Sequence, residues 1–134
     1  MTYEVQKTDR EWQEQLSPEA YHVLRKHGTE RAGTSPLNHV SGPGKFSCAG
    51  CGAELFDAGT KFESGTGWPS FFAPLSETAV GTKTDRSFFM TRTEVHCARC
   101  GGHLGHVFPD GPAPTGQRYC MNGVALTFEP LAAS

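Results

Sequence analysis

The chain has 134 residues, including 16 glycines, 9 prolines and 5 cysteines. A chain of this length usually forms one domain and can bury a modest core without the help of disulfides. The 12 basic and 14 acidic residues give a net charge of −2. This disfavours a nucleic-acid-binding protein, because such proteins usually carry a basic excess. No run of residues approaches the ~18 apolar positions of a membrane-spanning helix.

The first ten residues, Met1 to Arg10, contain neither the apolar segment nor the small-residue cleavage site of a secretory signal peptide. We therefore expect a cytoplasmic protein, in a reducing compartment where cysteines stay as thiols or bind metal. The odd number of cysteines favours a division into four of one kind and one of another.

The N-terminal residues 1–28 predict helical structure. Thr8 fits the N-cap of a capping box, and Ser17 is typical of the N-cap of a second helix. Gly28 is the expected end of that helix. Residues 29–44 are polar and rich in turn-forming residues, so we interpret them as a loop that wraps around the body of the protein.

From residue 45 onward, short runs of strand-forming residues alternate with turns. The candidate strands are Lys45–Cys48, Glu54–Asp57, Val80–Lys83, Ser87–Cys97, Val107–Phe108, Arg118–Asn122 and Val124–Phe128. Thr84–Arg86 is interpreted as a hairpin turn. The expected fold is mainly β, a single domain over residues 1–134, with a helical N-terminal segment and wrapping loop (1–44) before a metal-containing antiparallel body (45–134).

Two C-x-x-C pairs, Cys48 with Cys51 and Cys97 with Cys100, are separated by 45 residues, and each is followed by glycine. The two-residue spacer lets both sulfurs of a pair face one ion, and four thiolates complete a closed tetrahedral shell. We predict one structural zinc ion, or iron in a zinc-type site. Two disulfides or a redox-active pair are the alternatives, and a reducing compartment disfavours the disulfides.

The fifth cysteine, Cys120, falls within or at the end of a predicted strand. A lone cysteine is often only a small core residue. Arg118, two residues away, would favour its thiolate, and His103 and His106 precede it in the sequence. A cysteine near histidine and arginine has the outline of an activated nucleophile.

The segment Ser64–Phe72 holds two glycines, a tryptophan, a proline and two phenylalanines in nine residues. Trp68 can be an aromatic plug under a loop, or the wall of a binding pocket. An indole face suits a methyl group on a polarised sulfur. The residues alone leave both interpretations open.

Four segments resemble, in order, those of the B-type methionine sulfoxide reductases, which reduce the R epimer of methionine sulfoxide. The segments are CAGCGAELF (Cys48–Phe56), KFESGTGWPSFF (Lys61–Phe72), HLGHVFPDGP (His103–Pro112) and RYCMNG (Arg118–Gly123). The resemblance runs from about Trp12 to Phe128 and includes both C-x-x-C pairs.

The resemblance implies two antiparallel sheets with N-terminal helices, a zinc ion held by four cysteines, and roles for particular residues. It implies Cys120 as nucleophile, Trp68 against the substrate methyl group, His103, His106, Asn122 and Arg118 in the active site, and Asp110 fixing the loop before Cys120. The thiolate would attack the sulfoxide sulfur while a histidine protonates the oxygen, leaving a sulfenic acid on Cys120.

One position departs from the family pattern. Many members carry a resolving cysteine where this chain has Thr66. We therefore expect an external thiol, such as thioredoxin, glutaredoxin with glutathione or a small dithiol, to reduce the sulfenic acid. A metal-binding cysteine acting as resolver is the competing idea. The expected substrates are methionine-sulfoxide-containing peptides and proteins. We expect the protein to be a monomer and to have no nucleic-acid or membrane partners.

Other classes of function remain as alternatives. A zinc-stabilised module that binds peptides through Trp68 would share the fold but would not need Cys120 or the histidines. A thiol–disulfide oxidoreductase acting through a C-x-x-C pair would need that pair free of metal. A zinc-ribbon nucleic-acid binder is disfavoured by the net charge of −2.

Overall fold

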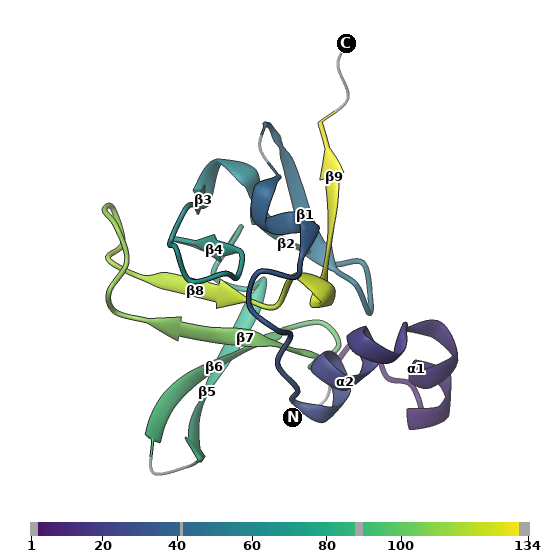
Figure 1. The fold of residues 1–134 in the computed structure, drawn as a ribbon. Helices are drawn as coiled ribbons and strands as arrows, with labels where there is room; N and C mark the ends of the chain where they lie inside the picture. Colours follow the sequence, from purple (N-terminus) through teal and green to yellow (C-terminus); the bar gives the residue numbers. More distant parts are fainter. Residues whose placement is uncertain (1–2, 41, 88–89, 132–134) are drawn as a thin grey trace.

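The computed structural model describes residues 3–40, 42–87 and 90–131. Two short helices, α1 (Asp9–Gln15) and α2 (Pro18–Lys26), precede a body of β-strands (Figure 1). Single turns of 3-10 helix are η1 (Pro36–His39), η2 (Ala58–Thr60) and η3 (Gly123–Ala125). The strands are β1 (Gly44–Cys48), β2 (Glu54–Asp57), β3 (Lys61–Phe62), β4 (Ser70–Phe71), β5 (Val80–Ser87), β6 (Met90–Cys97), β7 (His103–Phe108), β8 (Arg118–Met121) and β9 (Leu126–Pro130).

The strands form two sheets. One sheet has the order β2-β1-β9, and the other has the order β3-β4-β8-β7-β6-β5. Neighbouring strands in both sheets run antiparallel. The predicted fold class, mainly β with two antiparallel sheets and N-terminal helices, is therefore confirmed.

Aromatic rings join the two sheets in the core. Phe56 of β2 stacks on Phe71 of β4 with ring centroids 4.3 Å apart, and Phe46 of β1 meets Phe71 edge-on at 5.0 Å. All three side chains are fully buried, and burying a side chain of this size stabilises a fold by roughly 1.5–3 kcal/mol. Because one face of the larger sheet is used for this core, its other face is left for polar side chains.

Helix α1 begins at the predicted capping box. The Glu11 amide donates to the Thr8 hydroxyl, and the Glu11 carboxylate accepts from the Thr8 amide. The described residues before the helix, 3–8, are not helical, so the helical segment starts later than predicted. The capping box fixes this start, because it satisfies amides that have no partner within the helix.

Helix α2 begins after its N-cap Ser17, as predicted, but ends differently. The left-handed residue at its end is His27, with φ of 56°, and not Gly28. The Gly28 amide donates to the His22 carbonyl over 2.9 Å, one residue beyond the left-handed turn. Histidine is among the few non-glycine residues enriched in this conformation.

The hairpin turn predicted at Thr84–Arg86 is wrong. These residues lie within β5, which stays paired with β6 as far as Ser87. Asp85 stands opposite Arg92, and their side chains form an ion pair of 3.2 Å that the turn-like sequence did not indicate. Residues 88–89 of the predicted strand Ser87–Cys97 lie outside the described residues.

The last predicted strand, Val124–Phe128, starts later than expected. Residues up to Ala125 form η3, and β9 begins at Leu126. The amides of Gly123 and Val124 donate to the Glu30 carboxylate and so are not available to a sheet neighbour.

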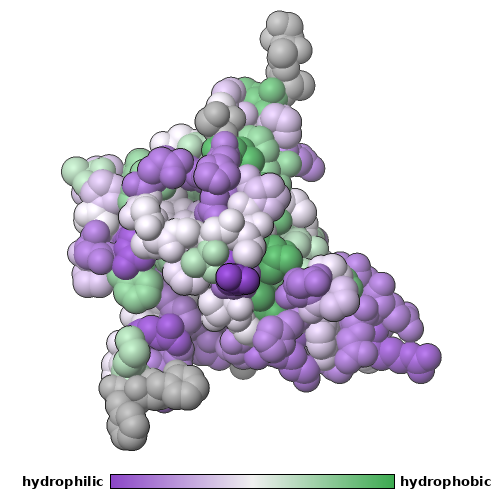
Figure 2. All heavy atoms as spheres, viewed as in Figure 1, coloured by the Kyte–Doolittle hydropathy of each residue, from purple (hydrophilic) through white to green (hydrophobic). Residues whose placement is uncertain are grey.

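Neither described helix is long and apolar enough to cross a membrane. In Figure 2, hydrophilic side chains dominate the outer surface of the helical part, at the lower right. This agrees with helices whose apolar residues Trp12, Val23 and Leu24 turn inward, where they are buried.

Candidate active site and metal centre

One row of residues runs across four neighbouring strands of the six-stranded sheet. Cys120 of β8 stands directly opposite Ser70 of β4 on one side and His106 of β7 on the other. His106 in turn stands directly opposite Glu94 of β6. Such partners point to the same face of a sheet, with Cβ atoms ~4.5–5.5 Å apart. Strand pairing therefore places Cys120 beside His106 on the face that the core leaves free.

An irregularity in β7 brings the other histidine to the same face. The predicted strand covered only Val107–Phe108, whereas β7 begins at His103 and its register with β6 shifts by one residue at Leu104. Residues three apart in a regular strand point to opposite faces, and one inserted residue restores them to the same face. The rings of His103 and His106 accordingly meet with centroids 5.4 Å apart.

A cavity of about 320 Å³ opens on this face of the sheet. The residues predicted for the site that line it are Trp68, His106, Arg118, Cys120 and Asn122. His103 does not line it: its side chain is only 3% exposed and lies behind His106, between that ring and the ring of His27. Burial lowers the pKa of His103 to about 4, so its imidazole is neutral near pH 7.

The Cys120 thiol is half-buried, and burial is the main influence on it. Burial raises the pKa of Cys120, while the Thr66 hydroxyl and the Arg118 guanidinium lower it to a smaller extent. The Thr66 oxygen lies 4.0 Å from the Cys120 sulfur. Arg118 thus acts in the expected direction, but burial outweighs it and Cys120 is chiefly a thiol near neutral pH.

Arg118 is held by a carboxylate and an aromatic ring. Its Nε and Nη2 atoms donate to the two oxygens of Asp110 over 2.9 and 3.2 Å. The guanidinium also lies 4.5 Å from the ring centroid of Phe108. The Asp110 hydrogen bond raises the pKa of Arg118, so the guanidinium is a fixed positive charge beside Cys120.

His106 has a carboxylate partner that the sequence did not reveal. Its Nε2 atom lies 3.0 Å from Asp85 Oδ2, and the same oxygen accepts from Arg92 Nη2 over 3.2 Å. Arg92 also lines the cavity. A carboxylate bonded to one ring nitrogen fixes the orientation and tautomer of a histidine, so Asp85 positions the His106 ring. Because the sequence predicted a turn at Asp85, it did not indicate that this carboxylate holds a histidine.

Glu30 ties together several parts of the site and was not predicted. Its carbonyl accepts from Trp68 Nε1 over 3.0 Å, and its amide donates to Asn122 Oδ1 over 2.9 Å. Its carboxylate accepts from the amides of Gly123 and Val124 over 2.8 and 2.9 Å. One residue of the wrapping loop therefore fixes Trp68, Asn122 and the chain that follows Cys120.

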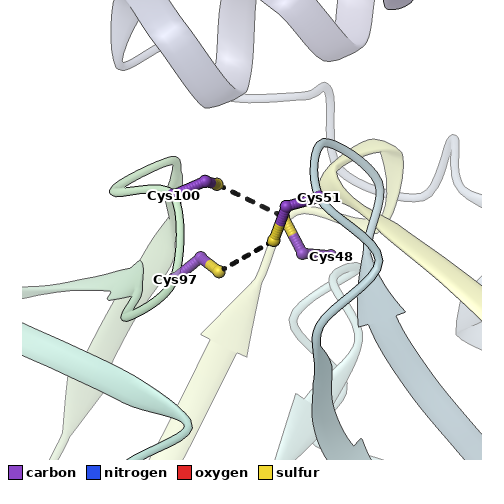
Figure 3. Close-up of side chains that lie close together, drawn as sticks. All are labelled: Cys48, Cys51, Cys97 and Cys100. Carbon is purple, nitrogen blue, oxygen red and sulfur yellow. Dashed lines mark hydrogen bonds between the residues drawn. The ribbon is translucent and has the colours of Figure 1, made fainter. Parts of the chain in front are cut away.

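The two C-x-x-C pairs meet where two hairpins face each other (Figure 3). Cys48 and Cys51 belong to the β1–β2 hairpin, and Cys97 and Cys100 to the β6–β7 hairpin. Their sulfurs all lie within 4.8 Å of one another, at 3.8 Å between Cys48 and Cys100 and 3.5 Å between Cys51 and Cys97. These distances are far longer than a disulfide bond of ~2.05 Å.

The same distances suit a metal ion. A tetrahedral site with metal–sulfur bonds of ~2.3 Å has sulfur–sulfur separations of ~3.8 Å. Gly52 and Gly101, which follow the two pairs, have φ of 79° and 77°. Their amides donate to the carbonyls of Cys48 and Cys97 over 2.9 and 2.8 Å. The glycine that follows each pair thus forms a turn behind it, and the four cysteines can hold a metal ion.

Protonation of the four thiols is uneven. The hydrogen bond with Cys100 is the main influence that raises the pKa of Cys48. For Cys51 the effect is opposite: hydrogen bonds with Cys100 first, and then with Cys48 and Cys97, lower its pKa. The amides of Gly50 and Gly102 donate to the sulfurs of Cys48 and Cys100 over 3.3 and 3.4 Å, which favours thiolates. A bound dication would let all four exist as thiolates, because it supplies the positive charge that they otherwise lack.

Comparison with known proteins gives a consistent result. The family model of the SelR domain matches residues 16–130. Proteins named peptide methionine sulfoxide reductase MsrB match nearly the whole chain. That of Agrobacterium fabrum is 54% identical over 127 residues, covering 95% of this chain and 94% of the relative. That of Methanosarcina barkeri is 57% identical over 125 residues, covering 93% and 88%.

A third relative, from Leptospira interrogans, is 52% identical over 129 residues and covers 96% of this chain and 98% of its own. The four predicted motifs, the two antiparallel sheets and the cysteine cluster lie within the matched region. The chain therefore belongs to the SelR-domain family and is a methionine sulfoxide reductase of the MsrB type.

Proposed function

We propose that this protein reduces the R epimer of protein-bound methionine sulfoxide, with Cys120 as the nucleophile. The observation that supports this most is one cavity on one sheet face that contains a cysteine, a histidine held by a carboxylate, and an indole. The cavity is small and open to the surface of the sheet, which suits a side chain presented by a peptide.

The chemistry follows from these positions. The Cys120 sulfur attacks the electrophilic sulfur of the sulfoxide, and the bond between that sulfur and its oxygen breaks. His106, oriented by Asp85, is the group placed to give a proton to the oxygen. The oxygen takes that proton and the proton of the Cys120 thiol and leaves as water, so the two sulfurs are joined. A water molecule then attacks the Cys120 sulfur, the bond between the two sulfurs breaks, and the substrate leaves as methionine with the electron pair of that bond. Cys120 is left as a sulfenic acid, and the proton released returns to His106.

The other cavity residues have supporting roles. Trp68 is held by its indole nitrogen, so its ring is fixed as a wall for the substrate methyl group. Asn122 is buried, with its amide bonded to backbone groups of Glu30 and Leu104. Arg118 supplies positive charge near the thiolate. We propose that His103 supports the ring of His106 from behind, because it is buried away from the cavity.

We propose zinc as the ion of the four-cysteine site. Four sulfur ligands leave no open position, so the ion would be structural and would take no part in the reaction. It would be held by Cys48, Cys51, Cys97 and Cys100. The chemistry that it supplies is restricted to keeping these four thiols as thiolates, unavailable for exchange.

We propose that an external thiol recycles the enzyme. Thr66 stands beside Cys120, at 4.0 Å from its sulfur, where many family members have a resolving cysteine. The sulfenic acid of Cys120 would form a mixed disulfide with thioredoxin, glutaredoxin with glutathione or a small dithiol, releasing water. A second thiol of the reductant would then free Cys120 and leave the reductant as a disulfide.

The remaining proposals concern the domain organisation, the oligomeric state and the location of the protein. We propose one domain over residues 1–134, acting as a monomer in the cytoplasm. None of the five cysteines forms a disulfide, which fits a reducing compartment. Size-exclusion chromatography with light scattering tests the oligomeric state.

An assay on separated epimers tests the proposed function. The wild-type protein is given peptides containing the R or the S sulfoxide, with dithiothreitol as reductant. We expect methionine only from the R epimer, and none with Cys120→Ser. Methionine production by Cys120→Ser would show that Cys120 is not the nucleophile, and no methionine from either epimer with the wild type would leave the peptide-binding module as the explanation of the cavity. That alternative is not favoured, because binding alone does not require Cys120 or the carboxylate-held His106.

A further inference from the structure

A second group of ligand atoms lies on the same sheet face as Cys120 but outside its cavity, apart from the four cysteines. It comprises His27 at the end of α2, Glu94 on β6 and His103 at the start of β7. Each side chain offers one nitrogen or oxygen atom, and the three atoms lie within 4.8 Å of one another. The cavity of the proposed reaction does not include any of these residues.

The geometry of this group fits a metal ion. Glu94 Oε2 lies 3.2 Å from His27 Nε2 and 3.5 Å from His103 Nδ1. Ligands of a tetrahedral ion with bonds of 2.0–2.1 Å are separated by ~3.3 Å. Two imidazoles and one carboxylate also form a donor set of open zinc sites, in which a fourth position is left to water.

An unsatisfied buried atom points to a missing partner. His103 Nδ1 is buried and makes no hydrogen bond within the described part of the chain, although the Glu94 carboxylate is nearby. Buried polar atoms are nearly always partnered, and exceptions call for an explanation such as an ion. The imidazole of His103 is neutral near pH 7, which is the form that binds metals.

Glu94 itself is buried, with two oxygens that face different groups. Oε2 faces His27 and His103, while Oε1 faces Lys83 at 3.8 Å and His96 at 3.9 Å. The Lys83 side chain is 60% exposed, so it can move into solvent when a cation approaches. A buried carboxylate surrounded by nitrogen atoms is therefore available to an ion through Oε2.

The backbone conformation of His27 places its imidazole next to the other two residues. It occupies the left-handed position that ends α2, where glycine is the usual residue. The turn directs an exposed imidazole onto the buried Glu94 and against the ring of His103, at 5.1 Å between centroids. The helix end thereby closes the group from the outside.

We propose that His27, Glu94 and His103 form a second metal site, for a divalent transition ion of which zinc fits the donor set best. Three protein ligands leave one position open to water. The site differs from the four-cysteine site in its ligands, and the end of α2 completes it in place of the β1–β2 hairpin. It does not depend on the proposed reaction.

Metal content of the full chain tests this proposal. The protein is equilibrated with excess zinc, freed of unbound ion, and analysed by mass spectrometry for metal per chain. We expect the wild type to hold one equivalent more than His27→Gly. This variant should fold normally, because glycine is well suited to the left-handed position. The matched control is His39→Ala, which removes another exposed histidine and should bind as much zinc as the wild type.

Cobalt distinguishes the two sites by their spectra. Cobalt bound to the four cysteines gives a strong thiolate charge-transfer band, and the additional equivalent should give only weaker visible bands. Those weaker bands should be absent from His27→Gly and from Glu94→Gln. Equal metal content in the wild type and His27→Gly would overturn the proposal, and so would a thiolate band for the additional equivalent. Both readouts are independent of catalysis.

Discussion

Opposing influences set the reactivity of Cys120. Burial disfavours its thiolate, while the Thr66 hydroxyl and the Arg118 guanidinium favour it. Asp110 binds Arg118 through both oxygens, so the guanidinium is held in place but also partly neutralised. Cys120 is thus mainly a thiol near neutral pH, and in the proposed reaction its proton is available when the sulfoxide oxygen leaves.

Alkylation measures this balance directly. Because the pKa of Cys120 is raised, its reaction with iodoacetamide should increase with pH beyond the range of an ordinary thiol. Replacing Arg118 by glutamine removes a charge that lowers the pKa, so the curve should move to still higher pH. Alkylation at pH 7 should then be several-fold slower. An exposed arginine of β5 provides the control, since Arg86→Gln should leave the curve unchanged.

Glu30 is a positioning residue for the site. Its carboxylate accepts from the amides that follow Asn122, and its backbone holds Trp68 and Asn122. Glu30→Gln keeps the shape but loses charge-assisted hydrogen bonds, which should lower stability by about 1–2 kcal/mol. We expect KM for the R epimer to rise, while the alkylation curve of Cys120 moves only slightly, to lower pH, because the Glu30 charge is the smallest of the influences that raise the pKa of Cys120. A rise in KM with Glu77→Gln, an exposed loop residue, would show that this effect is not specific.

Sequence patterns predicted the residues of the candidate site better than the partners that hold them. Cys120, His106 and Trp68 stand in distinctive motifs, and the structure places all three at one cavity. Glu30 and Asp85 were missed because each acts on residues far away in the chain. Single carboxylates in turn-like segments carry no local signal of a partner that only folding brings near.

At the scale of elements, β7 and β8 determine the geometry of the site. Their pairing puts His106 opposite Cys120, and Gly105 makes the close approach possible. A Cβ atom at Gly105 would lie 2.1 Å from the backbone oxygen of Cys120. No side chain can be accommodated there unless β8 moves.

Gly105→Ala should therefore displace β8. We expect a loss of stability of about 1–3 kcal/mol, as for other overpacked sites, and a larger fall in kcat/KM than in stability. Gly59→Ala is the control, because its Cβ atom would meet only the end of the Asp57 side chain, at 3.1 Å. The test compares the Tm and the kcat/KM of both variants with those of the wild type. Wild-type kcat/KM in Gly105→Ala would show that β8 tolerates the change.

Strand positions were largely predictable, but their pairing was not. Runs such as Glu54–Asp57 carry local patterns, and the structure shows strands there. The shift of register at Leu104 has no counterpart in the sequence, although it brings His103 and His106 to one face. The strands β3 and β4 were not predicted, because each has only two residues and so carries no alternating pattern.

At the scale of the whole molecule, the cysteine cluster joins parts that are distant in sequence. It connects a hairpin of the smaller sheet with a hairpin of the larger one. The helices close over it: Gln15 donates to the Gly50 carbonyl over 2.6 Å, and Arg25 donates to the Cys100 carbonyl over 3.1 Å. A metal ion there would hold both sheets and the N-terminal segment together.

Cys97→Ser should consequently unfold or strongly destabilise the chain, because binding of a structural zinc ion contributes to the free energy of folding. Thermal unfolding with and without a chelator measures this effect. The matched cysteine variant, Cys120→Ser, should keep the wild-type Tm and respond to the chelator like the wild type. If Cys97→Ser lost activity at an unchanged Tm, the cluster would have a chemical role and no structural one.

The most direct test of the account is a single turnover without reductant, followed by mass spectrometry of the protein. One equivalent of the R sulfoxide peptide should yield one methionine per chain and add one oxygen atom to Cys120, which dimedone should trap. The four cysteines of the cluster should remain without disulfides. An internal disulfide between Cys120 and Cys48, Cys51, Cys97 or Cys100, or methionine formed without oxidation of Cys120, would contradict the account.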